Sequence, residues 1–170
     1  MKKTYLLSAI ALLSIGLAAC SNNKDSSTES TTTQVGSSAN RKLAKDLDKQ
    51  FNTDGQRVVK TKVETDVVDD QSKTDSKGNQ KPHEVINVNV IDKETADKLK
   101  TDKAAIDNDS ATTDQKMYIA GIQEIISKEA KKLSNENDTI KFGHKIDGDN
   151  TDVYALSSKT KDVITQVTVD

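Results

Sequence analysis

The residues able to perform acid–base, nucleophilic or metal chemistry are few in this chain. It has two histidines, His83 and His144, and one cysteine, Cys20, which leaves too few ligands for a zinc site of the His/Cys type. The sequence contains no Gly-x-Ser-x-Gly elbow, no glycine-rich phosphate loop and no His-Glu-x-x-His motif. We therefore expect no catalytic site, no metal and no cofactor.

The two histidines lie in segments with different patterns. His144 is in phase with three apolar residues of one strand-like segment, Ile140, Phe142 and Ile146. We expect a partly buried histidine with a backbone partner here, in preference to a catalytic base. His83 follows Pro82 and precedes a second strand-like segment, which is typical of a loop residue.

The best candidate for a cation site is the acidic run from 147 to 152. Asp147, Asp149 and Asp152 place oxygens close together in a turn, where they could meet a hard cation such as Ca²⁺. An EF-hand loop needs Gly at its sixth and Glu at its twelfth position, and here these are Asp152 and Ser158. A solvated hairpin turn is therefore the preferred interpretation.

The first 20 residues combine a basic start, an apolar run and a cysteine. Lys2 and Lys3 precede an apolar run of 14 residues from Leu6 to Ala19. This run is shorter than the roughly 20 residues that a membrane-spanning helix needs. The pattern predicts a secretory signal peptide over residues 1–19.

The end of this run, Leu17-Ala18-Ala19-Cys20, resembles the lipobox of bacterial lipoproteins. The resemblance implies that the Cys20 thiol carries diacylglyceryl and that the mature chain begins at Cys20, on the extracytoplasmic face of the cell membrane. Two acyl chains give stable membrane anchoring, whereas one gives only marginal binding. The alternative interpretation of Cys20 is a buried or redox-active thiol.

The segment after Cys20 is polar and of low complexity. About half of the residues from Ser21 to Asn40 are Ser or Thr. Such a segment cannot bury enough apolar surface to offset its ordering entropy, so we expect residues 20–40 to be the lipidated cysteine and a disordered tether. As a flexible coil it would span on the order of 25 Å. In this layout the chain resembles small surface lipoproteins of Gram-positive bacteria.

The charge of the mature chain is mildly acidic. Without residues 1–19 the chain keeps 23 Lys and Arg against 27 Asp and Glu, a net charge of −4. Acidic and basic residues are mixed along the sequence, so no cluster of basic residues indicates binding to nucleic acid or attraction of the folded part to anionic lipid. Membrane attachment is therefore expected through the lipid on Cys20 alone.

Hydrophobic periodicity divides residues 41–170 into three expected helices and five expected strands. A helix ending near Asp54 is followed by strands at 57–68 and 84–91, which flank a polar loop. In these strands Val59, Val63 and Val67 alternate with Lys60, Lys62 and Glu64, while Ile86, Val88 and Val90 alternate with Asn87 and Asn89.

The second half begins with two helical patterns. Asp92 is a good N-cap for a helix to about residue 105, and Thr112 with Gln115 fits a capping box before a long apolar stripe. Strands are expected at 140–146, 152–158 and 161–169, the first two joined by an Asp-Gly hairpin signal. This order predicts one α+β domain over 41–170, an antiparallel sheet of about five strands with helices on one face.

These patterns favour a cell-surface, lipid-anchored and non-catalytic binding module. Its expected partner is a protein, a peptide or an envelope polymer, bound through the sheet or the loop at 69–82. The alternative is an envelope hydrolase, or a regulator of one, whose catalytic residues converge only in three dimensions. A pocket that holds His144 beside an Asp and a Ser would favour that alternative.

Overall fold

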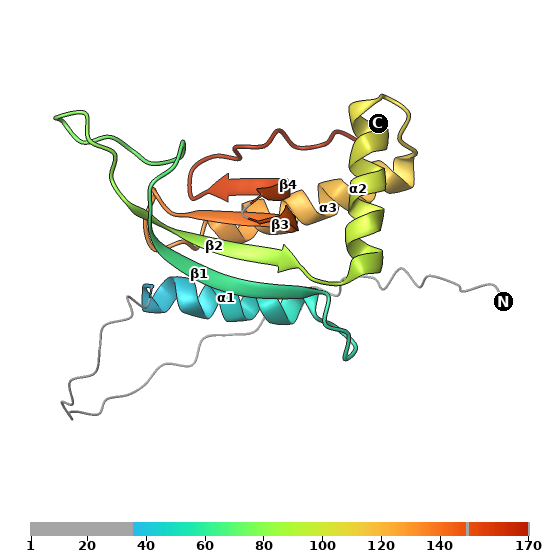
Figure 1. Ribbon diagram of the computed structural model, residues 1–170, viewed down its shortest axis with the longest axis horizontal. Coiled ribbons are helices and arrows are strands. Elements are labelled where there is room, and N and C mark those ends of the chain that lie inside the picture. The colour runs from blue at the N-terminus through green and yellow to red at the C-terminus, as the bar shows by residue number, and fades with distance from the viewer. Residues whose placement is uncertain (1–35, 149, 170) are drawn as a thin grey trace. The chain divides into compact units, whose positions relative to one another are not determined.

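The computed structural model describes residues 36–148 and 150–169. Within them lie three helices and four strands, in the order α1 (Ser38–Phe51), β1 (Val59–Val67), β2 (His83–Val90), α2 (Lys93–Asp107), α3 (Thr113–Ala130), β3 (Thr139–Asp147) and β4 (Asn150–Ser158). Figure 1 shows α1 beneath the sheet, with α2 at the end where β2 terminates. The α+β class expected from the sequence is confirmed.

The sheet has the order β1-β2-β3-β4. Its outer pairs, β1 with β2 and β3 with β4, are antiparallel, but the central pair β2 and β3 is parallel. The expectation of an all-antiparallel sheet is therefore wrong. Two helices connect β2 to β3 and return the chain to the same end of the sheet, which gives a parallel pair.

The strand expected at 161–169 is also absent, so the described sheet has four strands and not about five. These residues form an irregular segment that the side chain of Gln123, in α3, holds through hydrogen bonds. Gln123 Oε1 accepts from the backbone N of Val167 at 2.7 Å, and Gln123 Nε2 donates to the carbonyl of Tyr154 at 3.0 Å. The buried side-chain amide of Gln123 thus provides hydrogen bonds to this segment that a neighbouring strand would otherwise provide.

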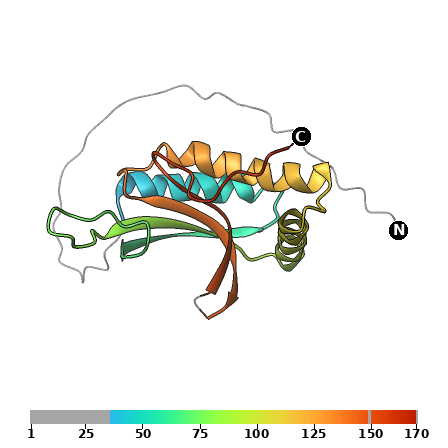
Figure 2. The ribbon, with the colours of Figure 1, turned by 90° about the horizontal axis from the view of Figure 1, so that it is seen from above.

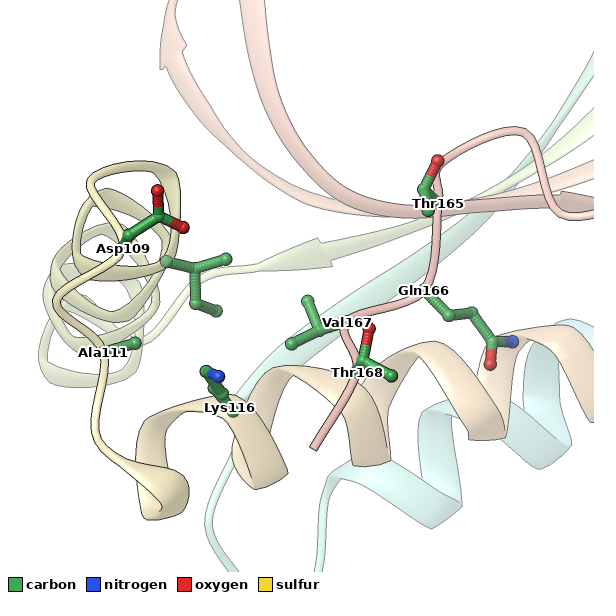
Figure 3. Close-up of a pocket in the computed structure, with 8 residues that line it drawn as sticks. Asp109, Ala111, Lys116, Thr165, Gln166, Val167 and Thr168 are labelled. Atoms are coloured by element: carbon green, nitrogen blue, oxygen red, sulfur yellow. The ribbon is translucent and has the colours of Figure 1, made fainter. Parts of the chain in front are cut away.

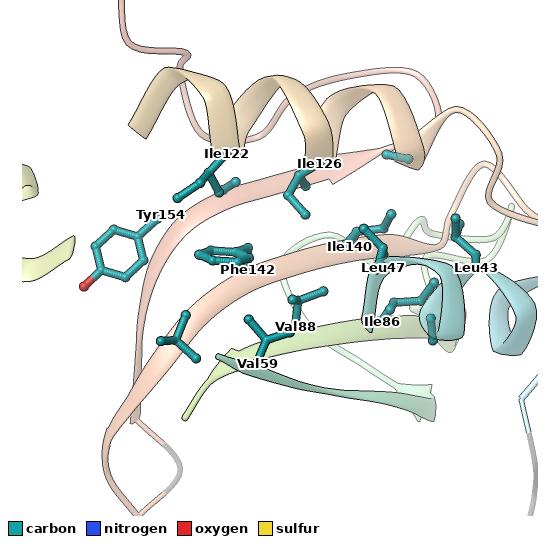
Figure 4. Close-up of a cluster of buried hydrophobic side chains, with 14 of the residues drawn as sticks. Leu43, Leu47, Val59, Ile86, Val88, Ile122, Ile126, Ile140, Phe142 and Tyr154 are labelled. Carbon is teal, nitrogen blue, oxygen red and sulfur yellow. The ribbon is translucent and has the colours of Figure 1, made fainter. Parts of the chain in front are cut away.

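One face of the sheet is covered by α1 and α3, which lie side by side in Figure 2. The hydrophobic core fills the space between this helix layer and the sheet (Figure 4). Leu47 of α1, Ile126 of α3 and Ile86 of β2 are all fully buried there. Alternation along β2, as expected, sends Ile86, Val88 and Val90 to this face and Asn87 and Asn89 to the other, where the buried Val85 also lies.

The signals at the starts of α2 and α3 are confirmed. The Asp92 carboxylate accepts from the backbone N of Thr95 at 2.8 Å, and Thr112 and Gln115 form the reciprocal bonds of a capping box. The Asp-Gly signal also marks the β3–β4 hairpin, where Gly148 has φ of +45°. Ile146, expected on the core face, is 65% exposed close to this turn.

Residues 38–40, which the composition assigned to the tether, form the start of α1. The Ser37 side chain caps this helix, and the backbone N of Ser37 donates to Glu84 Oε1 at 2.7 Å. Fully buried Asn40 donates to Glu84 at 2.7 Å and to Asp138 at 2.8 Å. This network joins α1 to β2 and to the α3–β3 connection, so the folded part begins before residue 41.

Candidate binding surface

The face of the sheet opposite α1 and α3 carries mostly polar side chains. Strand register brings them into rows, since Lys62, Asn87 and Lys141 are neighbours across three strands and Lys60 lies opposite Asn89 in the next row. Alternation along β3 adds Lys145 to the same face. The six side chains that define this open face are Lys60, Lys62, Asn87, Asn89, Lys141 and Lys145.

The lysines of the open face are mostly unpaired. Lys62 lies 3.2 Å from Glu64 in an exposed ion pair, whereas Lys60, Lys141 and Lys145 form no ion pair within the part of the chain that the structure describes. Lysines of α2 behave differently: Lys98 pairs with Asp102 and Lys103 with Asp107. An acidic chain therefore has a net positive patch on one face of its sheet, which attracts anions.

Asn87 lies at the centre of this face and has an unsatisfied donor. The residue is only 4% exposed, and its Nδ2 atom has no hydrogen-bond partner. Leaving a buried amide donor unpaired costs about 1–3 kcal/mol. A ligand oxygen that supplies the missing bond would remove this cost, and a functional role is one explanation for an unpaired buried group in a native protein.

The β1–β2 loop projects from one end of the sheet (Figure 1) and is tied to the α3–β3 connection. Lys73 donates its backbone N to Asn137 at 2.9 Å and forms an ion pair with Glu136 at 3.0 Å. At its tip Asp75 accepts hydrogen bonds from the backbone and side chain of Asn79 and from the backbone of Lys77, and these bonds lower the pKa of its carboxyl. The loop is exposed, as expected, but it is held in place.

His83 is not the loop residue that the sequence predicted. It is the first residue of β2, is 4% exposed, and its Nε2 lies 3.0 Å from Asp69 Oδ1. Its Nδ1 atom is buried and unpaired, as is Oε1 of Gln71 in the adjoining loop. The expectation failed because a proline before a residue indicates a turn but says nothing about what later covers that residue.

Both edges of the sheet are partly closed by hydrogen bonds from residues outside the strands. On β1, Asn52 Oδ1 accepts from the backbone N of Val59 at 2.8 Å and Asn52 Nδ2 donates to the carbonyl of Val59 at 3.1 Å. On β4, Gln123 bonds to Tyr154, and Val163 donates its backbone N to the carbonyl of Leu156 at 2.7 Å. Addition of a partner strand at these points would have to displace existing bonds.

His144 is half-buried and bonds to a side chain, not to the backbone. Its Nδ1 lies 2.9 Å from the Tyr154 hydroxyl, which in turn donates to Asp152 Oδ2 at 3.1 Å, and the two rings stack. Burial, reinforced by the Asp152 charge, raises the pKa of Tyr154 above its ordinary value, so the phenol stays protonated. The hydrogen bonds described for His144 bring no serine to it.

The acidic run at 147–152 does not gather into a cluster in the residues described. Asp147 Oδ1 accepts from Asn150 at 2.8 Å, Asp152 holds the Tyr154 hydroxyl, and Asp149 lies outside the described residues. Across 36–148 and 150–169, no group of three or more His, Cys, Asp or Glu is placed to hold a metal ion.

A cavity of about 460 Å³ lies where the C-terminal segment passes the junction of α2 and α3 (Figure 3). Its walls mix apolar and polar side chains: Ile106, Asp109, Ala111, Lys116, Thr165, Gln166, Val167 and Thr168. Sequence reasoning missed this cavity because it placed 161–169 in the sheet, where those residues could not have lined a space beside α3.

The lipobox residues Leu17, Ala18, Ala19 and Cys20 lie outside the described residues. Among the helices that are described, none is both long and apolar enough to cross a membrane. Comparisons with protein-family models, curated proteins and solved structures found no match.

Proposed function

We propose that this chain is a lipoprotein of the extracytoplasmic membrane face, anchored by diacylglyceryl on Cys20, whose folded domain is a non-catalytic binding module. The observation that supports the binding role is the open face, where a buried and unpaired amide donor lies among four lysines, three of which form no ion pair with any described residue. The lipobox resemblance supports the location. The closed sheet edges favour binding by the face of the sheet over addition of a strand.

Two measurements test this proposal separately. For the anchor, intact mass and membrane partition of the native chain are compared with those of Cys20→Ala. We expect the native protein to begin at Cys20, to carry the diacylglyceryl mass and to sediment with membranes, while the variant is released. Release of both proteins without lipid would overturn the anchor.

For the binding role, the mature chain is sedimented with purified, protein-free cell envelopes. We expect co-sedimentation of the native protein, and its loss when Asn87 is replaced by Asp, which places a negative charge at the centre of the open face. Retention of this variant at the native level would exclude the open face as the binding surface.

A hydrolase, or a regulator of one, is the alternative proposal, and the Asp152–Tyr154–His144 chain of hydrogen bonds is the feature that favours it. Histidine near a carboxylate can act as a general base when a substrate brings the nucleophile, for example water. Envelope digestion by the native chain, lost in His144→Gln, would support this function. Absence of digestion by the native chain would reject the hydrolase.

A further inference from the structure

The chemistry of the open face narrows the class of ligand. Lys60, Lys62, Lys141 and Lys145 offer ammonium donors, and Asn87 Nδ2 offers an unpaired amide donor. The carboxylate on the same strand face, Glu64, is already held by Lys62. A surface that presents donors and positive charge, and few free acceptors, fits a ligand rich in anionic oxygens.

The spacing of the lysines fits an anion that repeats along a chain. Lys60 and Lys62 are two residues apart on one strand, which places their Cα atoms about 7 Å from each other. Lys62 and Lys141 lie on either side of Asn87, two strand spacings or about 10 Å apart. A polymer with a charge on each repeat can meet each lysine where it lies, whereas one compact anion would have to draw several like-charged ammonium groups together at one point.

The cations of the open face suit contacts with phosphate that need no fixed geometry. Arginine is preferred where a carboxylate or a phosphate is bound by two parallel hydrogen bonds, while lysine acts as a point charge that binds phosphate oxygens in any orientation. The described residues contain two arginines, Arg41 in α1 and Arg57 before β1, and neither lies in a strand of the sheet. The open face is thus a lysine and amide surface.

From these observations we infer that the open face binds a phosphodiester-linked polyol polymer of the cell envelope, with phosphates on the lysines and one phosphate oxygen on Asn87 Nδ2. This inference rests on the proposed function, because an extracytoplasmic location makes an envelope polymer the polyanion within reach. Phosphates separated by a short polyol unit repeat on the scale of the lysine spacing, so one chain can contact several lysines together.

The test measures binding of purified poly(glycerol phosphate) to the full mature chain by titration calorimetry. The variant under test is the triple substitution Lys60→Gln, Lys62→Gln and Lys141→Gln. Its matched control is Lys42→Gln, Lys45→Gln and Lys49→Gln, which removes the same charge from exposed positions of α1 on the other side of the sheet. Thermal melts confirm that both variants fold.

We expect the open-face variant to bind at least roughly tenfold more weakly and the α1 variant to bind like the native chain. Native binding should weaken steadily as salt is raised, since each contacted phosphate releases counterions. Equal weakening by both variants would show attraction to net charge alone and would overturn the inference. Absence of binding at low salt would overturn it as well.

Three other probes separate the sources of anionic groups. Polygalacturonate carries carboxylates, single-stranded DNA carries phosphodiesters on a stiffer, base-bearing chain, and vesicles of phosphatidylglycerol carry phosphates on a surface. Tighter binding to any of these than to poly(glycerol phosphate) overturns the choice of ligand. Envelope binding that depends on Asn87 while poly(glycerol phosphate) fails to bind would leave the proposed function standing and reject this inference alone.

Discussion

Replacement of Asn87 by Leu should raise the stability of the fold while it weakens binding. Leucine has nearly the shape of asparagine but no polar atoms, so the substitution removes the unpaired Nδ2 donor from a residue that is 4% exposed. The desolvation cost of such a donor is about 1–3 kcal/mol, and most of it should be recovered in the free energy of unfolding. For a domain of this size that gain raises the Tm by several degrees.

The assay is urea unfolding followed by circular dichroism, with Asn89→Leu as the matched control. Asn89 lies two residues further along the same strand face, is half-buried and has no buried unpaired atom. Its substitution should change the free energy of unfolding by less than about 0.5 kcal/mol. A loss of more than about 1 kcal/mol in Asn87→Leu would show that Nδ2 is satisfied in the native protein, and the reasoning would be refuted.

Three further substitutions test other parts of the fold. Gln123→Ala should destabilise the fold by about 2–3 kcal/mol, because it leaves Val167 N–H and the Tyr154 carbonyl without their partner; hydrogen exchange should accelerate at 163–169, and unchanged protection there would contradict this role. Tyr154→Phe should flatten the loss of stability at alkaline pH. The folded state raises the pKa of this phenol, so its contribution is complete below the ordinary value near 10 and is lost as pH rises above it; parallel melting curves of the two proteins between pH 8 and 11 would exclude that assignment. Thr112→Ala should cost about 1 kcal/mol by removing the capping box of α3, measured by thermal melting, with the exposed Thr113→Ala as a control that keeps the cap.

The local elements of this protein follow from its sequence with few errors. Alternation of apolar and polar residues located β1 to β4 because one face of each strand packs on helices, and the period-two pattern records that asymmetry directly. The caps at Asp92 and Thr112 were found because their hydrogen bonds join residues three positions apart. Such signals arise between residues close together in the sequence, so they can be recognised without knowledge of the tertiary structure.

The strand pairing could not be derived in this way. The parallel contact of β2 with β3 depends on how α2 and α3 return the chain, and the residues 161–169 alternate like a strand yet bond to Gln123 of α3. Both outcomes result from contacts between residues more than 30 positions apart. Periodicity states which face of a segment is buried and leaves open which partner buries it.

The candidate binding surface shows the same division. From the sequence alone, Lys60, Lys62, Asn87 and Asn89 belong to the solvent face of their strands, and a lipobox-like motif ends at Cys20. The sequence showed no cluster of basic residues, because lysines that lie close together in the sheet, such as Lys62 and Lys141, are far apart in the sequence. Only the sheet register brings these lysines to either side of Asn87, because adjacent strands lie about 5 Å apart whatever their separation along the chain.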